Sequence, residues 1–290
     1  MAQSGRSEAW ARRLIALVGT LVLAACTTGG GATSSTPPET VEASSSSVAT
    51  SAAPADLTIF GAASLGKALE QIKSTYETAN PGSRITISTD SSAALEMKIE
   101  QGAPADVFLS ADTTNPKKLV DGGLADGAAT DVAGNKLTII TPKGNPAGLT
   151  SPFDLAKTGV RVIAAGDEVP ISRYAKQLVD KLAGEAGAPA DFAAKYAGNV
   201  VSKEENVSAL RTKIALGEGD AGIVYVTDAA ASDKVDTVAI PDASNVSATY
   251  AGVVVKASKD AEAAHAFLDW LSGPDGQAIL KEYGFLPPAG

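Results

Sequence analysis

The chain has 290 residues, of which 44% are hydrophobic and 20% charged, and its net charge is −9. This composition excludes global disorder, and the negative charge argues against nucleic acid or an anionic membrane surface as the main partner. One Cys and one His cannot build a disulfide framework, a Cys/His zinc site or a di-metal His cluster. The length predicts one large domain or two of medium size.

The first 25 residues are predicted to be a secretory leader that is not part of the fold. Arg6, Arg12 and Arg13 precede an apolar run over 14–25, whose length fits a signal peptide and is too short to span a bilayer. The only cysteine, Cys26, follows Leu-Ala-Ala and resembles the lipidation site of bacterial lipoproteins. The alternative is a buried free thiol. We therefore expect an exported protein that is lipid-anchored on the outer face of the cell membrane.

Residues 26–55 are predicted to be the lipidated Cys and a flexible tether. The segment is rich in Ser, Thr, Ala, Gly and Pro. It lacks the large apolar residues whose burial would offset the entropy lost on ordering. The folded part is therefore expected to begin near residue 57.

The folded part is predicted to alternate strands with helices. Short β-branched or apolar runs predict strands over 57–60, 84–88, 106–110, 136–140, 160–164, 221–226, 235–240 and 251–256. Apolar residues spaced three and four apart predict helices over 65–79, 172–182, 192–197, 204–216, 261–271 and 276–283, and another after Ser91 and Ser92. Such alternation predicts an α/β fold with parallel-rich sheets.

Two blocks of this kind predict two lobes with a hinge and a cleft between them. We expect the chain to leave the first lobe near Ile140 and to return near Ile240. Lobe 1 would then contain 57–140 plus 240–290, and lobe 2 would contain 141–239.

Four predicted helix starts point to an anion site in this cleft. Ligands of open α/β sheets lie beyond the carboxyl ends of strands, where helices begin. We expect Ser64 and Ser92 to be N-caps of two helices, and Ile171 and Val207 to open two others. The free N–H groups and partial positive charge at such starts can hold an anion without Lys or Arg. An acidic protein could bind an anion in this way.

Each of these candidates also has a purely structural interpretation. Ser64 and Ser92 can be plain N-caps, and Tyr225, at the end of a predicted strand, can be a core aromatic residue. The adjacent carboxylates Asp167 and Glu168 can bind a cation, although neighbouring acids more often form a solvated turn.

Several sequence strings together resemble the periplasmic molybdate-binding proteins of ABC importers. In chain order they are FGAASL at 60–65, SS at 91–92, GAPADVFLSAD at 102–112, VPI at 169–171 with RYA at 173–175, ENV at 205–207, GIVY at 222–225 and YGF at 283–285. The resemblance implies a type II periplasmic-binding-protein fold that captures molybdate, or tungstate, and delivers it to an ABC permease and its ATPase. It implies no cofactor, no catalytic residue and a monomer.

By the same resemblance, five residues would bind the oxyanion through neutral hydrogen-bond donors. Ser64 and Ser92 would offer hydroxyl and N–H groups, and Tyr225 its hydroxyl. Ile171 and Val207 would offer their backbone N–H groups. No metal would be bound beyond the molybdenum of the oxyanion itself.

Two positions depart from the family's pattern. Ser208 stands where relatives often have Arg, and Ile171-Ser172 stands where some have Ala-Gly. Neither change removes a backbone donor, but the part played by Ser172 stays open.

Two other classes of function remain possible. The ligand can be a different one, such as sulfate, ferric iron or an amino acid; sulfate carries the same charge as molybdate, and only cavity size would reject it. Iron would need carboxylate, His or Tyr ligands, and an amino acid a cationic partner. A hydrolase would use Ser64 or Ser92 as nucleophile and His265 as base, but His265 has no visible acid partner and is expected to be structural or exposed.

Overall fold

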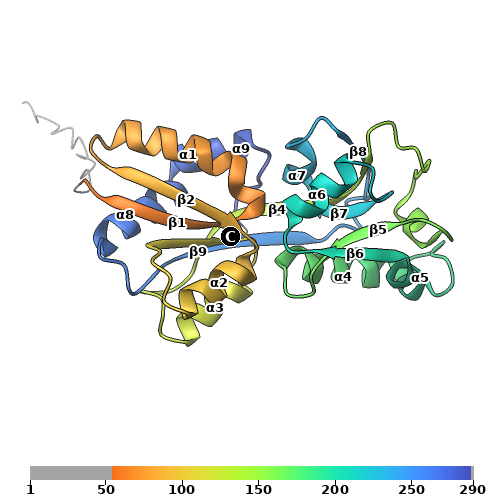
Figure 1. The fold of residues 1–290 in the computed structure, drawn as a ribbon, viewed down its shortest axis with the longest axis horizontal. Helices are drawn as coiled ribbons and strands as arrows, with labels where there is room; N and C mark the ends of the chain where they lie inside the picture. The colour runs from red at the N-terminus through yellow and green to blue at the C-terminus, as the bar shows by residue number, and fades with distance from the viewer. Residues whose placement is uncertain (1–53, 289–290) are drawn as a thin grey trace, which may run out of the picture. The chain divides into compact units, whose positions relative to one another are not determined.

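The computed structural model describes residues 54–288, which form two α/β lobes joined by two long strands (Figure 1). Lobe 1 contains strands β1 (Asp56–Ala62), β2 (Arg84–Asp90), β3 (Val107–Ser110) and β9 (Ser247–Val254), the first part of β4 (Thr130–Pro142), the 3-10 turn η1 (Ala63–Leu65), and helices α1 (Gly66–Ala79), α2 (Ser92–Glu100), α3 (Thr114–Asp121), α8 (Ala261–Ser272) and α9 (Pro274–Glu282).

Lobe 2 contains the remaining elements. They are the end of β4, strands β5 (Val162–Ala165), β6 (Val200–Glu204), β7 (Gly222–Tyr225) and β8 (Val235–Val238), the 3-10 turn η2 (Pro152–Ala156), and helices α4 (Pro170–Ala183), α5 (Phe192–Asn199), α6 (Val207–Ala215) and α7 (Val226–Ala230). Within residues 54–288, no helix has the length and apolar character needed to cross a bilayer.

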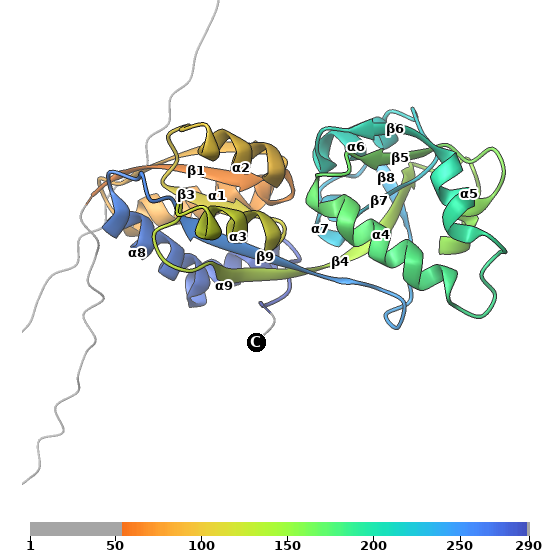
Figure 2. The same cartoon turned by 90° about the horizontal axis from the view of Figure 1, so that it is seen from below.

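The two-lobed α/β fold is confirmed, but the sheets are mixed rather than rich in parallel pairs. β1 pairs in parallel with β2 and β3, and β5 pairs in parallel with β6. β9 pairs antiparallel with β3 and β4, and β4 pairs antiparallel with β7 and β8. The difference arises because β4 and β9 carry the chain out of lobe 1 and back into it in opposite directions (Figure 2).

The passage between the lobes lies inside β4. Residues 130–136 of this strand pair with β9, whereas residues 137–142 pair with β7 or β8. The chain thus changes lobes between Lys136 and Leu137, and it returns to lobe 1 before Ser247. The chain needs no loop where it leaves lobe 1, because the single strand β4 continues from lobe 1 into lobe 2.

The core of lobe 1 fixes the turn that ends β1. On α1, Leu69, Ile72 and Tyr76 are buried, and the Tyr76 ring packs edge-on against Phe267 at a centroid distance of 5.1 Å. Burying each such side chain contributes roughly 1.5–3 kcal/mol. A Cβ at Gly61 would lie 2.3 Å from Leu69 Cδ1, so a larger residue there would force the buried Leu69 side chain to move. The residues after Gly61 are thereby held at the lobe surface.

Candidate functional site

A small cavity lies between the lobes at the starts of α2, α4 and α6 and at η1. It is lined from lobe 1 by Ala62, Ala63, Ser64, Asp90, Ser91, Ser92 and Ala111, and from lobe 2 by Val169, Pro170, Ile171, Asn206, Val207 and Tyr225. The volume open to a water-sized sphere is about 10 Å³, far below the roughly 300 Å³ at which pockets for drug-sized ligands begin. A small ion therefore suits the cavity better than an organic ligand. The structure brings all five residues expected to bind the oxyanion into its wall.

Ser92 enters the cavity as the first residue of α2, not as its N-cap. The N-cap is Ser91, whose hydroxyl accepts a hydrogen bond from the Ala94 N–H at 3.2 Å. The prediction is wrong by one residue because two consecutive serines both suit an N-cap. The Ser92 Oγ accepts from the Ala111 N–H at 3.0 Å. Its own hydrogen is therefore left to donate to a ligand.

Ser64 also differs from the prediction, because it lies within η1 and does not cap α1. Its Oγ is 2.9 Å from the Tyr250 hydroxyl. Either hydroxyl can be the donor in this bond. Asn135 Nδ2 donates to Thr227 Oγ1 at 2.9 Å and to the Tyr250 hydroxyl at 3.4 Å. When Tyr250 is the donor, the Ser64 hydrogen is free to donate into the cavity.

Ile171 and Val207 open α4 and α6, as predicted. Ile171 is the second residue of α4, after Pro170, and Val207 is the first residue of α6. The N–H groups of a first helical turn have no partner inside the helix. The side chains of Ile171 and Val207 are buried and apolar, so the polar groups that these residues can offer to the cavity are those of the backbone.

The two positions that depart from the family's pattern make contacts within the protein. The Ser172 hydroxyl donates to the Ala165 carbonyl at 3.0 Å within lobe 2. The Ser208 hydroxyl donates across the cleft to the Ala63 carbonyl at 3.4 Å. Neither serine lines the small cavity.

Tyr225 is fully buried at the end of β7 and still faces the cavity. Its hydroxyl donates to the Ala111 carbonyl at 3.4 Å, a long bond that can be exchanged for a better acceptor. Its ring packs edge-on against Tyr250, with centroids 5.5 Å apart. Burial raises the pKa of Tyr225 well above its ordinary value of 10. The hydroxyl therefore keeps its proton and remains a donor.

Asp90 is the only charged residue among those described that lines the cavity, and no sequence pattern singles it out. Its Oδ1 accepts from the Ser91 N–H at 2.8 Å and from Asn206 Nδ2 of lobe 2 at 3.4 Å. Its Oδ2 is 3.0 Å from Lys98 Nζ. Burial alone would raise the pKa of Asp90, but the bonds from Lys98, the Ser91 N–H and Asn206 lower it overall. The site thus combines neutral donors with one carboxylate.

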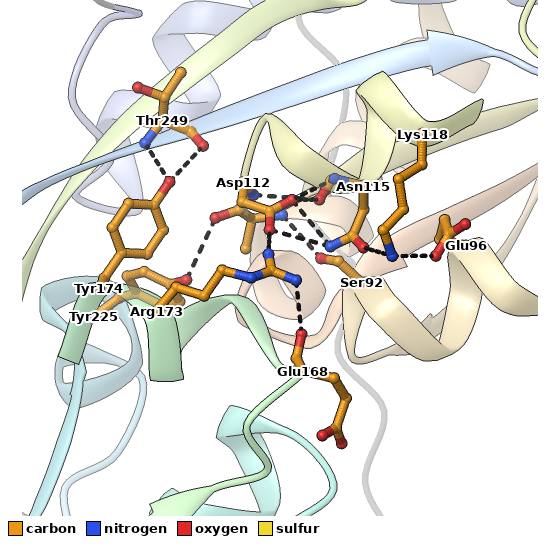
Figure 3. A network of polar contacts seen from close by, with 12 residues as sticks. Ser92, Glu96, Asp112, Asn115, Lys118, Glu168, Arg173, Tyr174, Tyr225 and Thr249 are labelled. Atoms are coloured by element: carbon orange, nitrogen blue, oxygen red, sulfur yellow. Dashed lines mark hydrogen bonds and ion pairs between the residues drawn. The ribbon is translucent and has the colours of Figure 1, made fainter. Parts of the chain in front are cut away.

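Polar contacts beside the cavity hold the lobes together (Figure 3). Arg173 of α4 forms an ion pair with Asp112, which follows β3 in lobe 1. The Tyr174 hydroxyl accepts from the Thr249 N–H at 3.2 Å and donates to the Thr249 carbonyl at 3.3 Å. Arg173 and Tyr174 both belong to the RYA string at 173–175, but the string alone does not indicate which residues they contact.

Residues proposed for other chemistries lie elsewhere. Asp167 and Glu168 are exposed, and Asp167 pairs with Lys203 at 2.6 Å. Within residues 54–288, no group of three or more His, Cys, Asp or Glu side chains could hold a metal ion. His265 on α8 pairs with Asp126 at 3.1 Å and does not line the cavity. Cys26 and the leader lie outside the described residues.

Comparisons with known proteins agree with this geometry. The family of bacterial extracellular solute-binding proteins matches residues 57–286. The molybdate-binding protein ModA of Mycobacterium tuberculosis is 33% identical over 233 residues, which cover 80% of this chain and 85% of the relative. ModA of Escherichia coli is 33% identical over 237 residues, which cover 79% of this chain and 88% of the relative.

Solved structures share the fold. The periplasmic molybdate-binding protein of Azotobacter vinelandii superposes with a TM-score of 0.66 at 24% identity, covering 80% of this chain and 100% of that one. The sulfate-binding protein SubI of Mycobacterium tuberculosis superposes with a TM-score of 0.71 at 20% identity, covering 80% and 87%. Both likenesses concern the fold. Taken with the sequence matches, they show that this chain belongs to the bacterial extracellular solute-binding proteins, in the group that contains the molybdate-binding protein ModA.

Proposed function

We propose that this protein captures molybdate, and also tungstate, outside the membrane and delivers it to the permease and ATPase of an ABC importer. The hydroxyls of Ser64, Ser92 and Tyr225 and the N–H groups of Ile171 and Val207 would bind the oxyanion. The observation that carries the proposal is their convergence: residues from five separate parts of the chain line one small cavity between the lobes.

The chemistry of the cavity favours an oxyanion that carries no proton. Fully deprotonated molybdate has only acceptor oxygens, and each of the five groups can donate to one. Hydrogen bonds to charged groups contribute roughly 1.5–3 kcal/mol each. Several of them, less the costs of closure, would give an affinity on the order of 8 kcal/mol, which corresponds to a micromolar dissociation constant or lower.

A hydrolase is not supported by the site. Ser64 and Ser92 would both need a general base within hydrogen-bond reach. The only histidine of the chain, His265, pairs with Asp126 on lobe 1 and is absent from the cavity wall. The named relatives are binding proteins, in agreement with a site that binds without reacting.

Calorimetric titration of the protein with molybdate, tungstate, sulfate and phosphate tests the proposal. We expect tight one-to-one binding of molybdate and tungstate and much weaker binding of the other two. Preferential binding of sulfate would replace the proposed ligand by a smaller oxyanion of the same charge. Absence of binding to all four would reject an oxyanion site.

We further propose that the protein acts as a monomer that is exported and held at the membrane by lipid on Cys26. The family's extracellular location supports export, and the Leu-Ala-Ala-Cys string supports lipidation. Membrane fractionation of the wild-type protein, before and after removal of Cys26, tests the anchor.

A further inference from the structure

The carboxylate of Asp90 is an anomaly in a cavity whose other polar groups suit an anion. It stands at the end of β2, directly before the N-cap of α2. The positive end of the α2 dipole and its free N–H groups would otherwise favour a negative ligand. A carboxylate at this position takes up part of the stabilisation that the helix start offers to an anion, and its charge repels a second anion.

The acceptor capacity of Asp90 is nearly used up by the protein. An ionised carboxylate offers about four lone-pair sites. Three of them are taken, by the Ser91 N–H, by Asn206 Nδ2 and by Lys98 Nζ. One site therefore remains, and only a ligand that carries a proton can use it.

The charge of Asp90 is only partly neutralised. Lys98 is its one cationic partner among the described residues, and the Lys98 side chain is half exposed. Water screens the charge of Lys98 more effectively than that of Asp90, which lies in the cavity wall. The pair therefore leaves a net negative field on the ligand side.

We propose that Asp90 is a specificity-determining residue of the oxyanion site, which weakens the binding of fully deprotonated dianions and spares anions that can donate a hydrogen bond. This inference rests on the function proposed above, and it concerns how tightly the site holds its ligand. A dianion held less tightly dissociates faster, because affinity differences within one site are expressed mainly in the dissociation rate. Asp90 would thereby ease release of the ligand to the importer.

The first test replaces Asp90 by Asn, which keeps an oxygen that can accept from Ser91 and Asn206. We expect Asp90→Asn to bind molybdate and sulfate about tenfold more tightly than the wild type, with a slower dissociation rate. The gain should shrink as ionic strength rises. Asp121→Asn on α3, which removes an exposed carboxylate paired with Lys117, is the matched control and should leave affinity unchanged.

The second test uses Lys98. Lys98→Gln unmasks the Asp90 charge, so the variant should bind molybdate severalfold more weakly. In the double variant with Asp90→Asn, the Lys98 change should have little effect, because the charge that it compensates is gone. Equal effects of Lys98→Gln in both backgrounds would show that Lys98 acts independently of Asp90.

Titration with phosphate distinguishes an effect of the Asp90 charge from a purely structural effect of the substitution. Hydrogen phosphate can donate its proton to the free acceptor site of Asp90, so Asp90→Asn should gain less for phosphate than for sulfate. A structural role would change the binding of both ligands equally. If the wild type binds none of these anions, the proposed function fails; if it binds them and Asp90→Asn binds no tighter, the role of Asp90 fails.

Discussion

Arg173 of lobe 2 and Asp112 of lobe 1 form an ion pair beside the cavity between the lobes. The Asp112 side chain is 5% exposed and that of Arg173 is 32% exposed. The Ser110 hydroxyl and the Asn115 side-chain amide donate to the same carboxylate at 2.8 and 3.0 Å. Lobe 1 thus presents a fixed negative group that Arg173 reaches only when the lobes are together.

Arg173→Gln is expected to favour an open form of the protein, in which the two lobes lie further apart. The variant leaves Asp112 without its cationic partner in the closed form, whereas opening lets water reach that carboxylate. Because Arg173 is one-third exposed, the loss is smaller than for a fully buried pair, about 1–2 kcal/mol. Molybdate affinity should fall about tenfold, and small-angle scattering of the ligand-free protein should show a larger radius of gyration.

Lys176→Gln is the control for this variant. Lys176 lies three residues after Arg173 on α4 and pairs with Asp180 on the surface of the same helix. The Lys176→Gln variant loses one positive charge, as Arg173→Gln does, but it loses no ion pair with lobe 1. Equal losses of affinity in the two variants would mean that the charge of α4, rather than the interlobe pair, is responsible.

Tyr225→Phe is expected to weaken molybdate binding without unfolding the protein. The ring still packs against Tyr250, and the hydroxyl gives up only a 3.4 Å bond to the Ala111 carbonyl. Loss of a donor to a bound anion costs roughly 1.5–3 kcal/mol, or about ten- to a hundredfold in dissociation constant. Calorimetric titration with molybdate measures the loss of affinity, and thermal melts of the ligand-free variant measure its stability.

Ile171→Val is the matching backbone control for Tyr225→Phe. Ile171 is fully buried, so truncation to Ala would leave a cavity, whereas Val costs only about 0.5–1.5 kcal/mol of stability. The N–H group survives the change, and affinity should stay near that of the wild type. Near-normal binding by Tyr225→Phe as well would remove its hydroxyl from the site.

The sequence predicts most of the strands and helices and five residues that line one cavity, because local periodicity and a family resemblance both depend on short strings. It does not reveal contacts between distant strings. Asp90 was overlooked because a carboxylate after a strand is ordinary in isolation and becomes unusual only when three helix starts surround it. The pairing of Arg173 with Asp112 likewise joins two strings 61 residues apart, and no local pattern reports it.

Several element boundaries were missed for similar reasons. The predicted helix over 204–216 begins late: residues 200–204 form β6, and Asn206 caps α6 by accepting from the Ala209 N–H. β6 is partly exposed and pairs only with β5 in a two-stranded sheet. Such a strand need not contain the run of apolar residues by which a buried strand is predicted, and residues 200–204 contain only two apolar residues.

Asp228 is expected to make stability fall as pH rises toward neutrality. It is fully buried on α7, its Oδ1 lies 3.5 Å from Arg211 Nη1, and its Oδ2 has no partner among the described residues. Burial raises the pKa of Asp228 to about 7, and the distant Arg211 lowers it only in part. The unfolded chain has the ordinary value of 3.8, so the folded state binds more protons between these pH values.

The sign follows from this difference in proton binding. The contribution of Asp228 is fully present below about pH 4 and is lost as pH rises through 7, by on the order of 4 kcal/mol. Asp154 acts in the opposite direction, since burial raises its pKa but the bonds from the Thr150 and Ser151 N–H groups and from Lys157 together lower it overall, and that effect lies at more acidic pH. Urea unfolding at pH 5, 6, 7 and 8 should show falling stability in the wild type and a flatter profile in Asp228→Asn. A flat wild-type profile would contradict the assignment.

Cys26→Ala is expected to release the protein from the membrane while leaving its affinity for molybdate unchanged. The residues that separate Cys26 from the first strand contain no large apolar run, so they are not expected to transmit the loss of the anchor to the lobes. Fractionation of cells that express the variant, followed by calorimetry of the released protein, measures both effects. Ser35→Ala, in the same segment, should stay in the membrane fraction. Retention of Cys26→Ala in that fraction would show that lipid on this cysteine is not what holds the protein there.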